Sequence, residues 1–250
     1  ITSDFVSRNV FGLKPVFTFT ITHMMPLSTY GHVLFLGVII GAMGVVYNTT
    51  LSKTQDLYER IPWRLVKILI PFMLAGVFGF LYRGVLGGGH ALVEELSAGD
   101  MVLGSLCLLL VVKFCFSMVS FGSGAPGGIF LPLLVLGAII GSIYYRVAEH
   151  MSPSLSGLLV NFIILGMAGY FSAIVRAPIT GIILISEMAG SFSHLLTLSM
   201  VSLAAYLVPD MLHCAPVYDQ LLHRLLRKQN PDKQATLTGE KVLVEGMIFH

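Results

Sequence analysis

The sequence predicts an all-α, polytopic membrane protein with tilted, broken and re-entrant helices. Of its 250 residues, 55% are hydrophobic and 11% are charged, whereas about 25% of the residues of a soluble globular chain are charged. The mean hydropathy is +0.84. The charges gather at the ends of long apolar runs, as membrane insertion requires. The runs differ in length, and some are shorter than the roughly 20 residues that cross a bilayer.

The first clear span is expected at residues 31–58. Gly37, Gly41 and Gly44 fall on one face of this helix, at a spacing that lets another helix approach closely. After the span, Trp63 is typical of an anchor at the membrane interface.

Further spans and shorter apolar runs follow in order. We expect spans at 68–85, 101–119 and 129–147, a short amphipathic segment at 91–95, and apolar runs at 157–172, 179–188 and 195–208. Runs of such unequal length are typical of transporters with broken and re-entrant helices. A polar helix is expected at 217–227, and its basic end indicates the cytoplasmic side.

A glycine-rich stretch lies between two of the longest runs, at residues 121–132. Glycine leaves the backbone unshielded by side chains, so N–H groups can be presented at close range. A helical pattern begins near Ile129, and the N-terminus of a helix favours an anion. The stretch therefore predicts a buried anion site; the alternative is that its glycines only permit tight helix packing.

Few other residues indicate chemistry. The three cysteines show no metal or disulfide spacing and are interpreted as small core residues: Cys107, Cys115 and Cys214. No histidine pair has metal-ligand spacing, and no nucleophile–base pair is visible, so neither a metal site nor a catalytic site is predicted. Lys113 and Arg176 are interpreted as snorkelling or helix-end cations, and Arg176 as a group able to satisfy free carbonyls at a helix break.

Two further residues have open alternatives. Glu187 ends an apolar run, where a carboxylate is either a proton carrier or a structural or interface residue. Ser123 either lines the entrance of a pore or supplies ordinary turn chemistry.

Three segments carry a resemblance to a known family. Gly124-Ala125-Pro126-Gly127-Gly128-Ile129-Phe130-Leu131-Pro132 resembles the G-x-F-x-P signature of the CLC chloride channels and proton–chloride exchangers. Residues 172–184 are similar to the next broken-helix segment of that family, and Ala215-Pro216-Val217-Tyr218 resembles the segment that holds its pore tyrosine. The matches occur in the family's order within a polytopic frame.

The resemblance implies a domain organisation. It covers roughly residues 31–226 and corresponds to the second inverted repeat of a CLC membrane domain. Residues 1–12 would end the last helix of the first repeat, 13–30 would form a loop, 31–228 the membrane domain, and 229–250 a linker with the start of a strand-containing cytoplasmic domain. The motifs of the first half, including the gating glutamate, are not in this sequence, so we expect it to hold only part of each anion site.

The resemblance also implies site residues. The N–H groups of Ile129 and Phe130 and the hydroxyl of Tyr218 would bind the anion. Gly127 and Gly128 would let the ion approach. Together with Pro132 they would support the backbone of the anion site. A tyrosine near a membrane edge is otherwise an interfacial residue, which is the alternative for Tyr218.

The expected function is chloride transport, as part of a voltage-gated-type channel or a proton-coupled antiporter, with chloride as the transported ion and no cofactor. The alternatives are a fluoride-selective transporter, a membrane enzyme and a non-transporting partner subunit. Expected partners are the anion, membrane lipid and a second copy of the chain, without nucleic acid; the dimer surface would include the helix near Phe11 and residues 179–188 and 195–208. A multi-pass location in a bacterial inner (plasma) membrane is expected.

Overall fold

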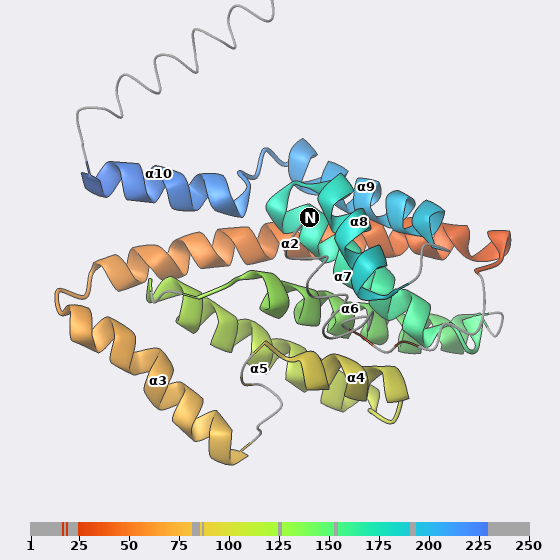
Figure 1. Cartoon of the computed structure of the whole chain (residues 1–250), viewed down its shortest axis with the longest axis horizontal. Coiled ribbons are helices and arrows are strands. Elements are labelled where there is room, and N and C mark those ends of the chain that lie inside the picture. Colours follow the sequence, from red (N-terminus) through yellow and green to blue (C-terminus); the bar gives the residue numbers. More distant parts are fainter. Residues whose placement is uncertain are drawn as a thin grey trace, which may run out of the picture. The chain divides into compact units, whose positions relative to one another are not determined.

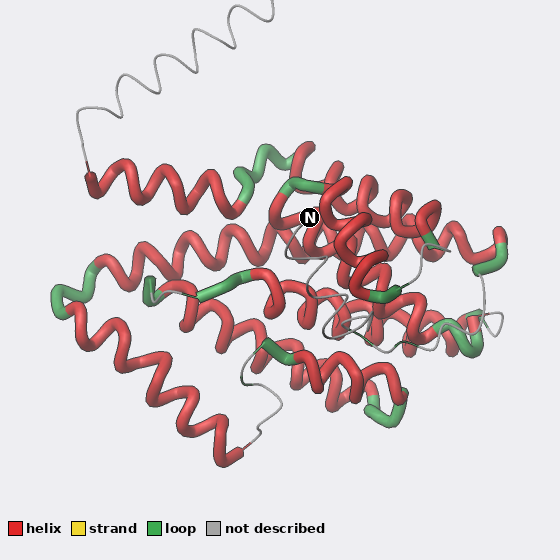
Figure 2. Tube along the Cα trace, in the orientation of Figure 1, coloured by secondary structure: helices red, strands yellow, loops and turns green. Residues whose placement is uncertain are grey.

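In the part of the chain that it describes, the computed structural model consists of helices joined by loops and turns, and Figure 2 shows no strand there. It describes residues 17, 19, 25–81, 86, 88–124, 127–152, 155–190 and 194–229. The expectations for residues 1–12, for most of the loop at 13–30 and for residues 230–250 lie outside these described residues. The predicted all-α class is confirmed.

The chain divides into two compact units, residues 1–214 and 215–250. In the first unit (Figure 1), the elements are η1 (Leu27–Thr29), α2 (Tyr30–Glu59), α3 (Arg64–Leu81), α4 (His90–Ala98), α5 (Leu103–Gly122), α6 (Phe130–Met151), α7 (Leu159–Val175), α8 (Pro178–Met188) and α9 (Leu195–Met211). In the second unit, α10 spans Val217–Gln229. Each predicted apolar run therefore forms a helix.

Helix α7 is the centre of the first unit. Its sequence, LVNFIILGMAGYFSAIV, is apolar around the whole circumference, which is the pattern of a helix enclosed on all sides. Accordingly, every residue from Asn161 to Ile174 is buried. It packs most extensively against α6 and α9, and also against α2 and α8.

Glycines bring α6 and α7 together at backbone distance. A Cβ atom added at Gly137 would meet the carbonyl oxygen of Gly166, and one added at Gly141 would meet the carbonyl oxygen of Phe162. Backbone atoms cannot move aside as side-chain ends can. Small residues are therefore required along this seam, as in other tightly packed membrane helices.

The predicted glycine face of α2 is confirmed. A Cβ added at Gly37 would lie 2.6 Å from the Cβ of Ala204, and one at Gly41 would lie 2.7 Å from the Cβ of Val208, both in α9. At Gly44 the neighbour is Ala173 of α7, at 2.7 Å. One helical face thus serves two partner helices.

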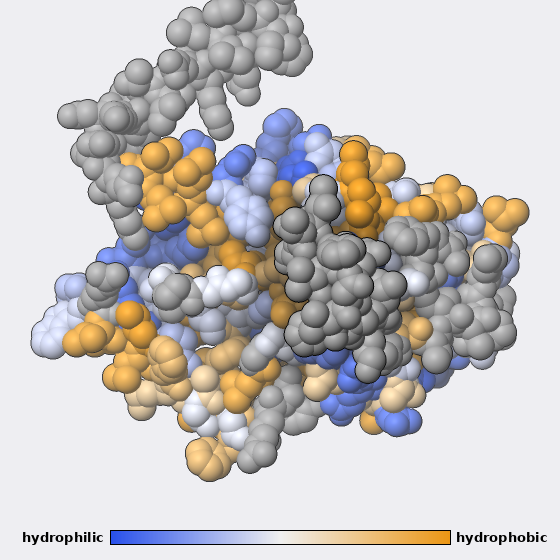
Figure 3. Space-filling view, in the orientation of Figure 1, coloured by the Kyte–Doolittle hydropathy of each residue, from blue (hydrophilic) through white to orange (hydrophobic). Residues whose placement is uncertain are grey.

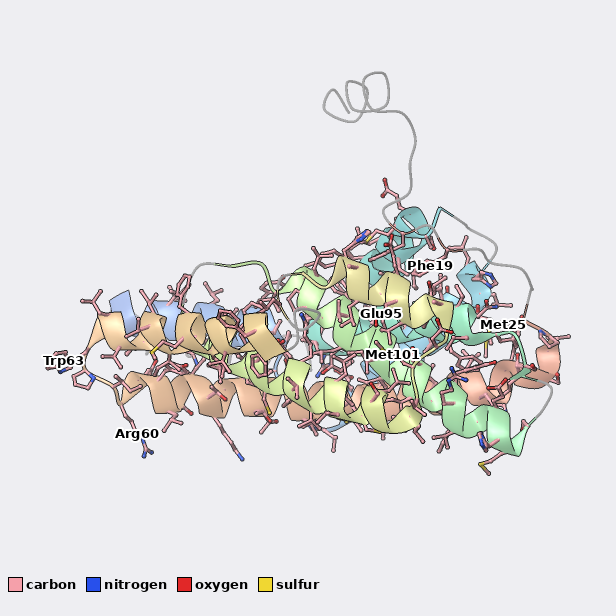
Figure 4. The ribbon with its side chains drawn as sticks, turned by 90° about the horizontal axis from the view of Figure 1, so that it is seen from below. Phe19, Met25, Arg60, Trp63, Glu95 and Met101 are labelled. Carbon is pink, nitrogen blue, oxygen red and sulfur yellow. The ribbon has the colours of Figure 1, made fainter. Side chains whose placement is uncertain are left out.

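Within the part of the chain that the structure describes, three helices are long and apolar enough to cross a membrane: Leu27–Glu59 (with η1 included), Leu103–Gly122 and Phe130–Met151. Apolar side chains cover much of the face seen in Figure 3. Between α2 and α3, Arg60 and Trp63 point outward at the turn (Figure 4), and Trp63 is 71% exposed. This position agrees with the predicted interfacial anchor.

The interpretation of the three cysteines as core residues is wrong. Cys107 and Cys115 are exposed on α5, and Cys214 is half-buried. Membrane helices expose apolar side chains to lipid, so an apolar run does not separate core positions from lipid-facing ones.

Candidate functional site

The glycine-rich stretch begins where α5 ends. Ser123 is the C-cap of α5, and its hydroxyl donates to the carbonyl of Ser120 at 2.7 Å. Gly124 follows with a φ of +73°, the left-handed conformation that commonly ends helices and favours glycine. The turn interpretation of Ser123 agrees with this contact.

Helix α6 opens immediately after the glycines. Ile129 is its N-cap, and the N–H of Leu133 donates to the carbonyl of Ile129 at 3.2 Å. The first four N–H positions of an α-helix have no acceptor in a preceding turn. Pro132 occupies one of them and has no N–H to leave unpaired. The donors that remain at this end belong to Ile129, Phe130 and Leu131.

Gly127 and Gly128 lack the usual structural reasons for being glycine. A Cβ built at either position meets no described atom within 4 Å. Neither residue is among those with a positive φ. Packing of described residues and backbone conformation therefore both tolerate a side chain here, and the space in front of the α6 N-terminus stays open.

The start of α6 is fixed against the protein interior. The ring of Phe130 packs edge-to-face on Phe171 of α7, with 5.6 Å between the ring centroids. Such aromatic pairs stabilise by about 0.5–1.5 kcal/mol beyond their buried area. The N–H groups of the first turn are thereby held on the central helix of the unit.

A pocket of about 460 Å³ lies between α5 and the start of α6. It is lined by Gly88, Lys113, Phe116, Ser117, Ser120, Phe121, Gly128, Phe130, Leu131 and Pro132. Residues at the start of α6, two serines and one lysine therefore line the same space.

Lys113 differs from its predicted role. It is 1% exposed, so its side chain does not snorkel outward. Its Nζ lies 3.5 Å from where a Cβ of Gly89 would be, in the connection before α4. The sequence shows Lys113 as the charge within an apolar run but not its place in the pocket, because that place depends on how α5 packs against α6 and on the connection before α4.

Tyr218 is the second residue of α10. Its helix start is defined within the second unit: Gln220 donates through its side chain to the carbonyl of Ala215 at 2.8 Å and through its backbone to that of Pro216 at 3.1 Å. The structure describes each unit by itself, so the approach of Tyr218 to the anion stays a prediction.

Arg176 and Glu187 lie at helix ends. Arg176 is the C-cap of α7 and donates to backbone carbonyls near the end of α9, which confirms its interpretation as a helix-end cation that satisfies carbonyls. Glu187 lies in the last turn of α8 with an exposed side chain. Its alternatives both stay open.

Known proteins show a consistent likeness. A family model described as voltage gated chloride channel matches residues 1–210. The H(+)/Cl(-) exchange transporter ClcA of Yersinia pestis bv. Antiqua (strain Angola) is 35% identical over 251 residues, covering 98% of this chain and 52% of the relative. The transporter of the same name from Vibrio cholerae serotype O1 (strain M66-2) is 37% identical over 239 residues, covering 94% and 51%.

Solved structures share the fold. A slow cyanobacterial Cl-/H+ antiporter superposes with a TM-score of 0.82 at 30% identity, covering 90% of this chain and 54% of that one. A CLC-type fluoride/proton antiporter gives 0.68 at 19% identity, covering 86% and 52%. The chain spans about half the length of the curated relatives it matches.

Proposed function

Because this chain belongs to the voltage-gated chloride channel family, we propose that it supplies the second half of the membrane domain of a proton-coupled chloride antiporter. The chain is a multi-pass integral membrane protein, and three helices among its described residues have spanning length. Relatives above 30% identity are named as H(+)/Cl(-) exchange transporters, which favours coupled exchange over a channel.

One observation carries the proposal: the open, glycine-fronted N-terminus of α6. An unpaired anion in a low-dielectric interior costs tens of kcal/mol by ideal Born estimates. A helix N-terminus contributes up to about 2 kcal/mol when partly buried, and direct N–H donors add to this. In our proposal the N–H groups of Ile129 and Phe130 bind chloride, and Gly127 and Gly128 leave room for it.

Partial charges suit a transported ion. A backbone dipole stabilises the anion without the full charge of a direct ion pair, so release stays possible. Lys113 lines the same pocket. Pro132 completes the helix start without adding a donor.

We assign the hydroxyl of Tyr218 as a further donor. A phenol O–H is neutral and can donate one hydrogen bond to an anion. The support is the Ala215-Pro216-Val217-Tyr218 segment and its place at the start of α10; the family match ends earlier, at residue 210.

The remaining assignments follow from the same family. We propose a homodimer in a bacterial inner membrane, in contact with lipid and without a cofactor or an enzymatic reaction. The relatives above 30% identity are named as transporters. The likeness to the fluoride antiporter, at 19% identity, shows the fold alone.

The test uses crystals of the full-length protein grown with bromide in place of chloride. We expect an anomalous peak within hydrogen-bond distance of the Phe130 N–H. Proton pumping driven by a chloride gradient in liposomes is the accompanying transport measurement. A structure without bromide near Phe130, at a concentration that supports transport, would contradict the assigned site.

A further inference from the structure

A second pocket of the first unit lies at the ends of two helices of spanning length. Its volume is about 580 Å³, and it is lined by residues 100–103 together with Arg146, Val147, His150 and Met151. Residues 100–103 lead from α4 into α5, and α6 ends at Met151. Among the described residues, none lines both this pocket and the one at the start of α6, so the two are separate sites.

The position of this pocket along the helices places it at the level of lipid headgroups. Helix α5 begins at Leu103 and α6 ends at Met151, and both helices are long and apolar enough to cross a membrane. The ends of spanning helices lie at the polar boundary of the bilayer. Met101, in the connection before α5, is labelled in Figure 4. A molecule in this pocket therefore has phospholipid headgroups as its immediate neighbours.

The polar groups of the pocket carry both signs of charge. Arg146 donates through Nη2 to the Gly99 carbonyl, which holds its guanidinium against the connection after α4. A guanidinium carries several N–H donors, so this contact leaves others for a ligand. Asp100 is exposed and adds a carboxylate. At the end of α6, Nδ1 of His150 lies 3.1 Å from the carbonyl of Arg146.

Exposed apolar side chains continue from the pocket along α5. At the pocket itself, Val102 is 75% exposed and Met151 is 80% exposed. Leu103, Cys107 and Val111 follow at intervals of four residues, which places them on one face of the helix, and all three are exposed. A charged pocket that continues into an apolar stripe matches a phospholipid, whose acyl chains extend from its headgroup.

We propose that this pocket, which we call the headgroup pocket, binds a phospholipid that carries both a phosphate and a primary ammonium, of the phosphatidylethanolamine class. The guanidinium of Arg146 binds the phosphate, which its planar fork suits, and the carboxylate of Asp100 accepts hydrogen bonds from the ammonium. A headgroup with only negative charge leaves Asp100 without a partner, and a choline has no N–H to donate. One acyl chain lies along the exposed face of α5.

The experiment uses delipidated full-length protein in detergent and measures the binding of single phospholipids by native mass spectrometry. The probes are phosphatidylethanolamine, phosphatidylcholine and phosphatidylglycerol with identical acyl chains. We expect the ethanolamine lipid to bind about fivefold more tightly than the other two, the scale of one exposed ion pair. Arg146→Gln should weaken all three by about tenfold, the scale of one hydrogen bond to a charged group.

Arg60→Gln is the matched control for Arg146→Gln. Arg60 points outward at the turn after α2 (Figure 4) and does not line the headgroup pocket. Its lipid affinities should equal those of the wild type. Equal affinities in Arg146→Gln as well would overturn the proposal.

Asp100→Asn tests the recognition of the ammonium. We expect the preference for ethanolamine over choline to shrink to within about twofold, while the phosphate contact remains. Glu95→Gln is its control, because Glu95 is an exposed carboxylate of α4 that does not line the pocket; it should keep the wild-type preference. A wild-type preference in Asp100→Asn would contradict the assigned headgroup.

Val102→Asp tests the pocket without changing Arg146. Val102 is the N-cap of α5, a position where aspartate is favoured, so thermal unfolding should remain as in the wild type. The added negative charge should repel the phosphate and weaken all three lipids severalfold. If Arg146→Gln does not fold, Val102→Asp and Asp100→Asn decide, and wild-type lipid binding in both overturns the proposal.

Glycerophosphoethanolamine, the same headgroup without acyl chains, distinguishes a lipid site from a site for a free phosphate ester. We expect it to compete with the lipid only at far higher concentration, because burial of the acyl chain contributes to lipid affinity. Competition at equal concentration would assign the pocket to a free phosphate ester and overturn the lipid. Chloride affinity should be unchanged in Asp100→Asn, so the failure of this proposal and the failure of the proposed function are separate outcomes.

Discussion

Glycine serves three purposes in this chain, and the surroundings of each residue distinguish them. Gly124 adopts a left-handed backbone, with a φ of +73°. Gly141 lies against the backbone of Phe162. Gly128 meets neither condition, since its φ is not positive and no described atom lies within 4 Å of an added Cβ. In the proposed site, the approach of the anion would be the reason for a glycine at position 128.

This difference predicts the behaviour of Gly128→Ala. The added methyl group has space, so the free energy of unfolding should change by less than about 0.5 kcal/mol. Chloride affinity should fall at least severalfold, because the methyl group stands before the N–H groups of α6. Calorimetric titration and thermal unfolding of the full-length variant measure both effects.

Gly104→Ala is the matched control for this substitution. A Cβ at Gly104 also meets no described atom within 4 Å, but Gly104 lies in α5, away from the residues that line the pocket. Its chloride affinity should be unchanged. Wild-type chloride affinity in Gly128→Ala would remove the main support for the site.

Single residues were predictable from the sequence where local chemistry decides their role. The turn chemistry of Ser123 and the helix start near Ile129 follow from their immediate neighbours. Lys113 was not predictable in the same way, because a charge in an apolar run is equally compatible with snorkelling and with an internal site. Packing between α5 and distant segments decides between them.

At the scale of helices, apolar run lengths predicted the elements well but not all their ends. The span expected at 31–58 is α2, Tyr30–Glu59. The run expected at 195–208 instead continues to Met211, with Pro209 inside α9. A proline inside a helix removes one backbone hydrogen bond and crowds the carbonyl of residue i−4. The helix nevertheless ends later, at the turn around His213, where Arg176 of α7 donates to the Pro209 carbonyl. That contact joins residues far apart in the sequence.

The seam between α6 and α7 predicts the effect of Gly141→Ala. The methyl group would overlap the Phe162 carbonyl and lie close to the Cα of Ile163. Overpacking of this kind typically costs about 1–3 kcal/mol, so the thermal unfolding temperature should fall clearly. Differential scanning fluorimetry of the full-length protein in detergent measures the change.

The control for Gly141→Ala is Gly76→Ala in α3. Gly76 has no described atom within 4 Å of an added Cβ, and alanine in a helix interior is favoured over glycine by about 1 kcal/mol. Its unfolding temperature should equal or exceed that of the wild type. Equal unfolding temperatures for the two variants would show that the α6–α7 seam relaxes around a methyl group.

At the scale of the whole molecule, burial follows position rather than run length. The run that forms α7 is shorter than a membrane span, yet it is the enclosed centre of the first unit. The longer helix α5 keeps exposed apolar residues such as Leu108 and Val111. Lipid-facing and buried positions are both apolar, so hydropathy does not distinguish them. The sequence therefore predicted membrane helices but did not show which helix is surrounded by the others.

Whether this chain can transport an anion alone also depends on the whole molecule. It spans about half the length of its curated relatives, and in our proposal the N-terminus of α6 is the helix start that it offers to the anion. A single helix N-terminus contributes up to about 2 kcal/mol, far less than the desolvation cost of a buried anion. We therefore expect liposomes that contain only residues 1–250 to show no chloride efflux above protein-free liposomes, while the full-length protein gives robust efflux under the same gradient. Efflux from the 250-residue chain at the full-length rate would mean that its own donors complete the path, and that the remaining half of the relatives is not needed to bind the ion.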